Sequence, residues 1–183
     1  MVRRWPIILT LLTGLIGCFS VTPDTGDEDA SCDGEVGLGC ELKDFTLRDE
    51  TGVEHRLHDL RGKVVLIAVG AEWCVACRAE MPVLAVDQQE LVDDGFVVIY
   101  VLNQDNNNQP ASASTVQAWV DEYQPPFVVV SDPADRVKRA YGSNLALPLL
   151  ILTDRSLRVQ LVGDALPLEE VRSEAERFLL LDE

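Results

Sequence analysis

The chain has 183 residues and a mass of 20.2 kDa, which suits one domain and excludes two full-sized ones. Hydrophobic residues make up 47% of it, so it can bury a core, and low-complexity or collagen-like classes are excluded. Fifteen Lys and Arg against 31 Asp and Glu give a net charge of -16, which repels phosphate backbones and argues against a nucleic-acid partner.

The first segment has the pattern of an export signal. Arg3 and Arg4 precede an apolar stretch at residues 7–17, which is shorter than the roughly 20 residues of a membrane-spanning helix. We therefore expect a signal peptide at residues 1–17. The stretch ends in Leu-Ile-Gly-Cys at Cys18 and resembles the bacterial lipobox, in which the cysteine becomes the lipidated first residue. An ordinary secreted protein with a leftover thiol is the alternative.

Residues 18–37 have the composition of a tether. Residues 19–37 carry six acidic side chains and no basic one, so this lipidated acidic linker is expected to stay solvated. Loss of Arg3 and Arg4 with the signal would change the charge from -16 to -18. Membrane contact would then depend on acyl chains, since anionic headgroups repel such a body. The folded domain is expected at residues 38–183.

Strands and helices alternate along the folded part. It is predicted to open with a small hairpin at residues 45–47 and 54–57. Apolar runs at residues 64–69 and 96–102 are typical of strands buried on both faces, and helical spacing predicts a helix at residues 75–93 between them. This β-α-β order predicts parallel strands. The later predicted elements are a helix capped by Ser114 and Gln117, a strand at 127–130, a helix capped by Asp132 with Pro133 first, a hairpin at 149–152 and 159–162, and a helix opening at Pro167.

The cysteine count favours lipidation of Cys18. Five cysteines are an odd number for an oxidising compartment, and removing Cys18 leaves four, which allow three pairings. We pair Cys32 with Cys40 and Cys74 with Cys77. The first pair is expected to be a structural disulfide contributing at most about 2.6 kcal/mol across so short a loop, with a redox relay as the alternative.

The second pair forms a Cys-x-x-Cys motif between a predicted buried strand and a helix. This placement puts the Cys74 sulfur at the helix N-terminus, where free N–H groups and the helix dipole favour a thiolate. We therefore predict that Cys74 attacks and that Cys77 resolves the mixed disulfide. A zinc site would need a second ligand pair at metal spacing. The remaining candidates give none: they are Cys32, Cys40, His55 and His58.

Several strings around this motif carry a family resemblance. They are Leu-Arg-Gly-Lys-Val-Val-Leu at residues 60–66, Trp-Cys-Val-Ala-Cys-Arg-Ala-Glu-Met-Pro at 73–82, Asp132, Ala-Tyr-Gly at 140–142 and Leu-Pro at 147–148. Over about residues 41–181 the chain resembles the thioredoxin superfamily, and specifically its membrane-tethered, extracytoplasmic TlpA/ResA-like redoxin branch. The resemblance implies an α/β fold: a thioredoxin-like three-layer sandwich, with a mixed central sheet flanked by helices, an N-terminal β-hairpin and an inserted helix.

The resemblance also implies roles for site residues. Trp73 flanks the nucleophile, and Cys74 and Cys77 form the redox pair. Pro148 matches a proline that is cis and faces the disulfide, the alternative being an ordinary trans proline. Glu80 matches a glutamate near the pair, for which we hypothesise assistance in proton transfer, with a surface salt bridge as the equal alternative.

Three positions depart from the family pattern. Ala76 stands where a proline is usual, Ala68 stands where thioredoxins proper hold a buried acid, and Leu147 is larger than the usual residue before the cis proline. Because no acid is present at position 68, the proton acceptor must be Glu80 or water. The amide-rich residues 103–109 follow a strand at its carboxyl end, where they could line a substrate groove or form a plain loop.

The leading functional prediction is a thiol-disulfide oxidoreductase, anchored by lipid in the periplasm, that reduces or exchanges disulfides of exported proteins. The resemblance implies recharging by a membrane dithiol donor. We expect a monomer that needs no cofactor and does not bind nucleic acid. The alternatives are a thiol peroxidase of the peroxiredoxin type and a copper-binding metallochaperone, the latter weakened because no histidine follows Cys77. The direction of electron flow stays open, because it depends on the relative stability of the dithiol and disulfide forms. A difference of 30 mV in reduction potential corresponds to about 1.4 kcal/mol, which the motif does not reveal.

Overall fold

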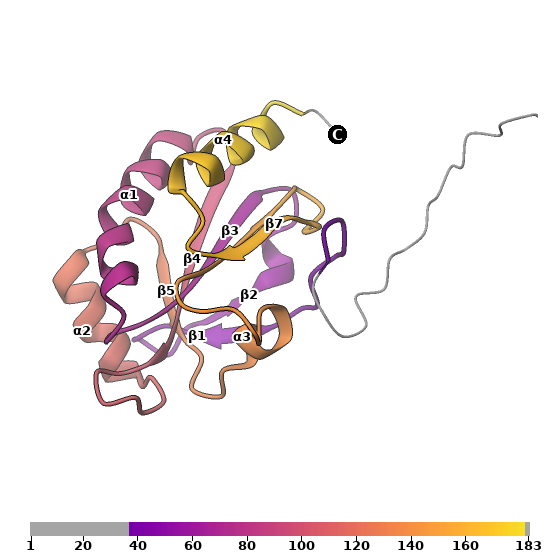
Figure 1. Ribbon diagram of the computed structural model, residues 1–183. Helices are drawn as coiled ribbons and strands as arrows, with labels where there is room; N and C mark the ends of the chain where they lie inside the picture. The colour runs from indigo at the N-terminus through magenta and orange to yellow at the C-terminus, as the bar shows by residue number, and fades with distance from the viewer. Residues whose placement is uncertain (1–36, 182–183) are drawn as a thin grey trace, which may run out of the picture.

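A mixed seven-stranded sheet forms the centre of the protein, which the computed structural model describes over residues 37–181 (Figure 1). The strands are β1 Thr46–Arg48, β2 Glu54–Arg56, β3 Val64–Ala71, β4 Phe96–Gln104, β5 Val128–Ser131, β6 Leu149–Thr153 and β7 Val159–Asp164. The helices are the 3-10 helix η1 Leu57–Leu60 and the α-helices α1 Val75–Leu91, α2 Ala113–Tyr123, α3 Arg136–Tyr141 and α4 Leu168–Leu179.

The two apolar runs of the sequence form strands β3 and β4, which lie in the middle of the sheet. The order is β2-β1-β5-β4-β3-β6-β7. Strands β3, β4 and β5 are parallel, with Val64 opposite Phe96, so the predicted β-α-β unit through α1 is confirmed. The predicted hairpins β1–β2 and β6–β7 are also confirmed as antiparallel pairs.

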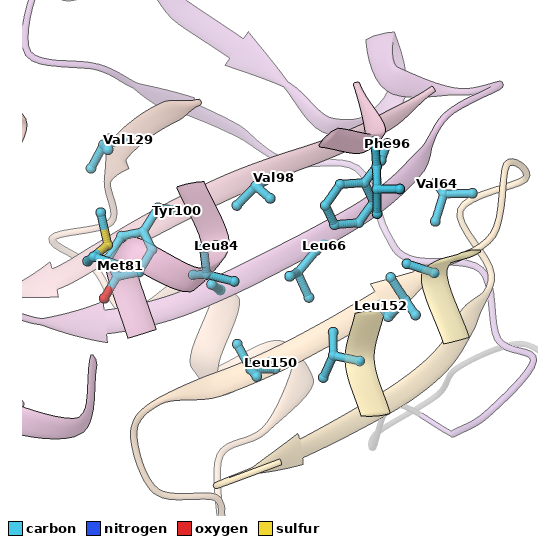
Figure 2. Close-up of a cluster of buried hydrophobic side chains, with 14 of the residues drawn as sticks. Val64, Leu66, Met81, Leu84, Phe96, Val98, Tyr100, Val129, Leu150 and Leu152 are labelled. Carbon is cyan, nitrogen blue, oxygen red and sulfur yellow. The ribbon is translucent and has the colours of Figure 1, made fainter. Parts of the chain in front are cut away.

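Helices cover both faces of this sheet, which confirms the predicted three-layer α/β architecture. On one face α1, α2 and α4 pack over side chains of β3, β4 and β6, and Figure 2 shows part of this cluster. On the other face η1 and α3 pack over the intervening residues of the same strands. Every residue of β3 is buried because both of its faces are covered, as the unbroken apolar run predicted.

Two helix starts differ from the predictions. Helix α2 is capped by Ser112, whose side chain accepts the backbone N–H of Thr115 at 3.2 Å, so the prediction of Ser114 with Gln117 is wrong by two residues. The Thr115 hydroxyl completes the capping box by accepting the N–H of Ser112 at 3.1 Å, the role that the sequence pattern gives to glutamine or glutamate.

The start of α3 is also later than predicted. The carboxylate of Asp132 does accept a helical N–H, that of Val137, at 2.8 Å. Pro133, however, lies in a turn closed by the N–H of Asp135 on the carbonyl of Asp132 at 2.9 Å, and the helix begins only at Arg136. Pro133 therefore shapes the turn before the helix and is not its first residue. The C-terminal helix does follow Pro167 directly, as predicted.

Several N-terminal predictions lie outside the described residues. They are the signal peptide, Cys18, Cys32 and all but the last residue of the lipidated linker predicted at residues 18–37. Cys40 is buried and has no disulfide partner within residues 37–181, so its pairing with Cys32 stays a prediction. Over the same residues, no helix has the length and apolar character that a membrane span requires.

Candidate active site

The Cys-x-x-Cys motif lies at the junction between the central strand β3 and helix α1. Cys74 is the N-cap residue of α1, with extended backbone, and its sulfur accepts the backbone N–H of Cys77 at 3.2 Å. The two cysteines form a disulfide, with an S–S distance of 2.07 Å. The first turn of the helix thus directs the N–H of Cys77 at the Cys74 sulfur, and a helix N-terminus favours a thiolate at this place.

The two sulfurs differ in their access to solvent. The Cys74 residue is 4% exposed, whereas Cys77 is fully buried at 0%. Beside them Trp73 is 43% exposed and Val75 is 80% exposed, an apolar pair on the surface next to the disulfide. A substrate sulfur would therefore reach Cys74 before the enclosed Cys77.

The cis proline follows a residue that packs against the same disulfide. The Leu147–Pro148 peptide bond is cis, which agrees with the family resemblance and not with the trans alternative. Val69 of β3 pairs with Leu149 of β6, so Pro148 enters the sheet next to the end of β3. Leu147 packs against Ala71, Cys74 and Cys77.

Glu80 lies one helical turn beyond Cys77 and is half-buried. Burial raises the pKa of its carboxyl from an ordinary 4.5 to about 7. Its Oε2 atom is buried without a hydrogen-bond partner, and within residues 37–181 no arginine or lysine pairs with it. The salt-bridge alternative is therefore not formed there, and the carboxyl can gain or lose a proton near neutral pH.

Arg78 fastens a loop to the rim of the site, a role that the sequence did not reveal. Its Nε donates to the carbonyl of Glu72 at 2.6 Å, and its Nη2 donates to Oδ1 of Asn106 at 3.3 Å. Glu72 accepts the N–H of Asn106 at 3.0 Å, and Trp73 donates its Nε1–H to Gln104 at 3.0 Å. The amide-rich residues 103–109, for which a substrate groove and a plain loop were both open, thus lie against both residues preceding Cys74, because parallel strands end at one edge.

The two histidines lie away from the disulfide. His55 pairs with Asp49 at 2.7 Å, and His58 contacts the Leu42 carbonyl at 3.1 Å. In the part of the chain from residue 37 to 181, no group of three or more His, Cys, Asp or Glu side chains could hold a metal ion.

Comparison with known proteins identifies the family that uses this geometry. Residues 38–162 match the AhpC/TSA family. The chain belongs to this family. Among curated relatives, the thiol-disulfide oxidoreductase ResA of Geobacillus thermodenitrificans is 28% identical over 93% of this chain and 91% of its own length. ResA of Geobacillus kaustophilus is 29% identical over 96% of this chain and 94% of its own length.

Other relatives point to the same chemistry. The thiol:disulfide interchange protein DsbE of Pseudomonas fluorescens biotype C is 41% identical over 38% of this chain and 33% of its own. Among solved structures, a thiol:disulfide interchange protein from a Bacteroides species superposes with a TM-score of 0.65 at 22% identity, covering 81% of this chain and 93% of that one. That likeness confirms the thioredoxin-like fold.

The family and the geometry together confirm the predicted enzyme class. The chain is a ResA/DsbE-like thiol-disulfide oxidoreductase of the AhpC/TSA redoxin family, with a redox-active disulfide between Cys74 and Cys77.

Proposed function

We propose that this chain is a lipid-anchored oxidoreductase outside the cytoplasm that passes electrons from its Cys74–Cys77 dithiol to disulfides of exported proteins. One observation carries the proposal: the Cys74 sulfur lies at the N-terminus of α1, beside the exposed side chains of Trp73 and Val75, while Cys77 is enclosed beneath it. The names of the ResA and DsbE relatives support dithiol exchange as the reaction.

The reaction proceeds in two exchanges. The Cys74 thiolate attacks one sulfur of the substrate disulfide, so that the substrate S–S bond breaks, a mixed disulfide forms and the first substrate thiolate leaves. Cys77 then loses its proton and attacks Cys74, which closes the Cys74–Cys77 disulfide and releases the second substrate thiolate. Two electrons pass from the enzyme to the substrate, and a dithiol donor restores the enzyme by the reverse sequence.

Glu80 is the proposed acceptor of the Cys77 proton. Cys77 is fully buried, so its proton needs a nearby base, and position 68, where an acid would be the alternative, holds the buried Ala68. The ionised fraction of Glu80 changes most around pH 7, where its pKa lies. Trp73 and the Leu147–Pro148 segment flank the pair and would limit water around the reacting sulfurs.

The location of the enzyme belongs to the same proposal. The sequence pattern of residues 1–17 followed by Cys18 supports export and lipidation, and the acidic linker supports a body held close to a membrane without binding its headgroups. The recharging partner would then be a membrane protein with a dithiol. A structural disulfide between Cys32 and Cys40 would close the junction between linker and domain.

A trapping experiment tests substrate and location together. In a full-length Cys77→Ser variant expressed in a bacterium and quenched with acid and alkylating agent, the mixed disulfide on Cys74 cannot be resolved. We expect adducts with exported proteins that vanish on reduction and that sediment with membranes. The matched control, Cys74→Ser with Cys77→Ser, should give none.

Two results would overturn the proposal. One is the absence of reducible adducts in the Cys77→Ser strain. The other is consumption of hydrogen peroxide by the reduced wild-type protein at a higher rate than its reduction of a protein disulfide, since that outcome describes a thiol peroxidase.

A further inference from the structure

A tyrosine from the neighbouring strand lies directly beneath the redox pair. A Cβ atom built on Gly70 would lie 2.1 Å from the hydroxyl oxygen of Tyr100 and 3.3 Å from the Cβ of Cys77. The Tyr100 hydroxyl therefore occupies the space that a side chain at position 70 would fill, between β3 and the first turn of α1. Only glycine at position 70 leaves room for it.

This hydroxyl is buried without a hydrogen bond. Tyr100 is 1% exposed, and within residues 37–181 its hydroxyl has no partner. Its ring stacks on Trp119 with centroids 5.6 Å apart, and Figure 2 shows it among the buried side chains of the core cluster. A phenylalanine would fill the same space without the cost of burying an unpaired hydroxyl, so packing alone does not account for the oxygen.

Among residues 37–181, two other side chains of this region have an unpaired buried polar atom: Trp119, whose Nε1–H can only donate, and Glu80, whose carboxylate can accept. The Oε2 atom of Glu80 is buried without a partner in the described part of the chain, and it lies on the face of α1 that carries Cys77. The charge of Glu80 acts on Tyr100: after burial, it is the next cause that raises the pKa of the tyrosine far above its ordinary value. The hydroxyl thus stays protonated at any working pH and is available as a donor.

Within residues 37–181, Glu80 is the one charged acceptor that faces this donor. The charged and titratable groups facing Tyr100 are Glu80 and Arg78 from α1 and Tyr123 from α2. Arg78 has no acceptor atom, and it points its guanidinium over Trp119 and toward Asn106. The strand partners of this region, Ala68 and Leu150, carry no polar side-chain atom.

We propose that Tyr100 is a positioning residue for the proton transfer of this enzyme: its hydroxyl donates to the ionised carboxylate of Glu80, directly or through one water, and holds it toward Cys77. The inference rests on the role of Glu80 given under the proposed function. In the resolving step the Cys77 proton passes to the Glu80 carboxylate, the Cys77 sulfur bonds to the Cys74 sulfur, and the substrate thiolate leaves. Tyr100 keeps its own proton throughout.

A hydrogen bond to the charged form of Glu80 favours ionisation of this carboxyl. Removal of the hydrogen bond should therefore raise the pKa of Glu80. Tyr100→Phe should move the midpoint of the resolving step to higher pH by about one unit, which lowers its rate at pH 7 about fivefold. The measurement is a single turnover of the fully reduced protein with one equivalent of an aromatic disulfide that releases a coloured thiolate. The first release reports attack by Cys74, and the second reports attack by Cys77 on the mixed disulfide.

A second tyrosine provides the matched control. Tyr141, on the opposite face of the sheet, donates its buried hydroxyl to the carbonyl of Lys43 at 2.6 Å. Tyr141→Phe should therefore lower the melting temperature and leave the pH profile of the second release unchanged. Tyr100→Phe should shift the pH profile of the second release without lowering the melting temperature, because it removes a hydroxyl that has no partner in the disulfide form.

Combination with Glu80→Gln separates the possible outcomes. In the Glu80→Gln background, Tyr100→Phe should cause no further change, since its effect passes through the carboxylate. A wild-type pH profile for Tyr100→Phe, or an equal slowing in both backgrounds, would overturn the inference while leaving the role of Glu80 intact. A Glu80→Gln variant that keeps the wild-type profile would instead overturn the proposed proton step, and the role of Tyr100 with it.

Discussion

Cys74→Ser should lower the rate of dithiol-disulfide exchange by at least about 10⁴-fold, because a hydroxyl is almost never ionised near neutral pH and does not replace a thiolate nucleophile. The side chain is nearly buried and similar in size, so the fold should be retained. The rate of reduction of a protein disulfide with a dithiol as electron source measures the loss, and circular dichroism checks the fold.

Cys77→Ser is the appropriate comparison for this variant. Its Cys74 sulfur still lies at the N-terminus of α1, so the first exchange should proceed and stop at one equivalent of released thiolate. Full turnover by Cys74→Ser, or a Cys77→Ser variant inert in the first exchange, would contradict the assignment of Cys74 as the attacking residue.

Glu80→Gln should slow the resolving step about 100-fold at pH 7 and remove its inflection near that pH, because an amide cannot accept the Cys77 proton. The physical basis is the burial that raises the pKa of the Glu80 carboxyl to about 7. The second thiolate release, followed from pH 5 to 9, measures both effects. Glu122→Gln, which alters a more exposed carboxyl paired with Arg78, provides the control and should leave the inflection in place.

The same carboxyl should affect stability in a defined direction. Its folded-state pKa is raised, so the folded protein binds the proton more tightly than the unfolded chain does. The free energy of unfolding of the oxidised protein should therefore fall as pH rises from about 4.5, the ordinary value, through about 7. In Glu80→Gln this fall should be smaller. A steeper fall in the variant would contradict the buried, unpaired state of the carboxyl.

Local patterns in the sequence predicted most of the fold. The run at residues 64–69 showed a strand covered on both faces, and the Cys-x-x-Cys motif at the start of a helical pattern placed Cys74 at the N-terminus of α1. The cap of α2 was predicted wrongly because several hydroxyl side chains compete at its start, and residue type alone does not distinguish Ser112 from Ser114. For α3 the predicted Asp132 does accept a helical N–H, but the turn that contains Pro133 delays the first helical residue to Arg136.

The remaining features of the site depend on contacts distant in sequence. The fit between Gly70 and Tyr100 arises only when β3 and β4 pair in register and α1 closes over both. Likewise, Arg78 joins Glu72 to the loop at Asn106 across two strand ends. A glycine near a strand end and a tyrosine in an apolar strand are each unremarkable signals, and only the sheet register combines them.

The ionisation of Cys74 near neutral pH is the property on which the rest depends, and alkylation of the fully reduced protein tests it most directly. The rate constant for modification of Cys74 is measured between pH 5 and 9, with the labelled position identified by mass spectrometry. The account predicts that at pH 6 to 7 Cys74 reacts much faster than N-acetylcysteine, while the enclosed Cys77 reacts slowly. A Cys74 rate equal to that of the small thiol over this range would contradict it.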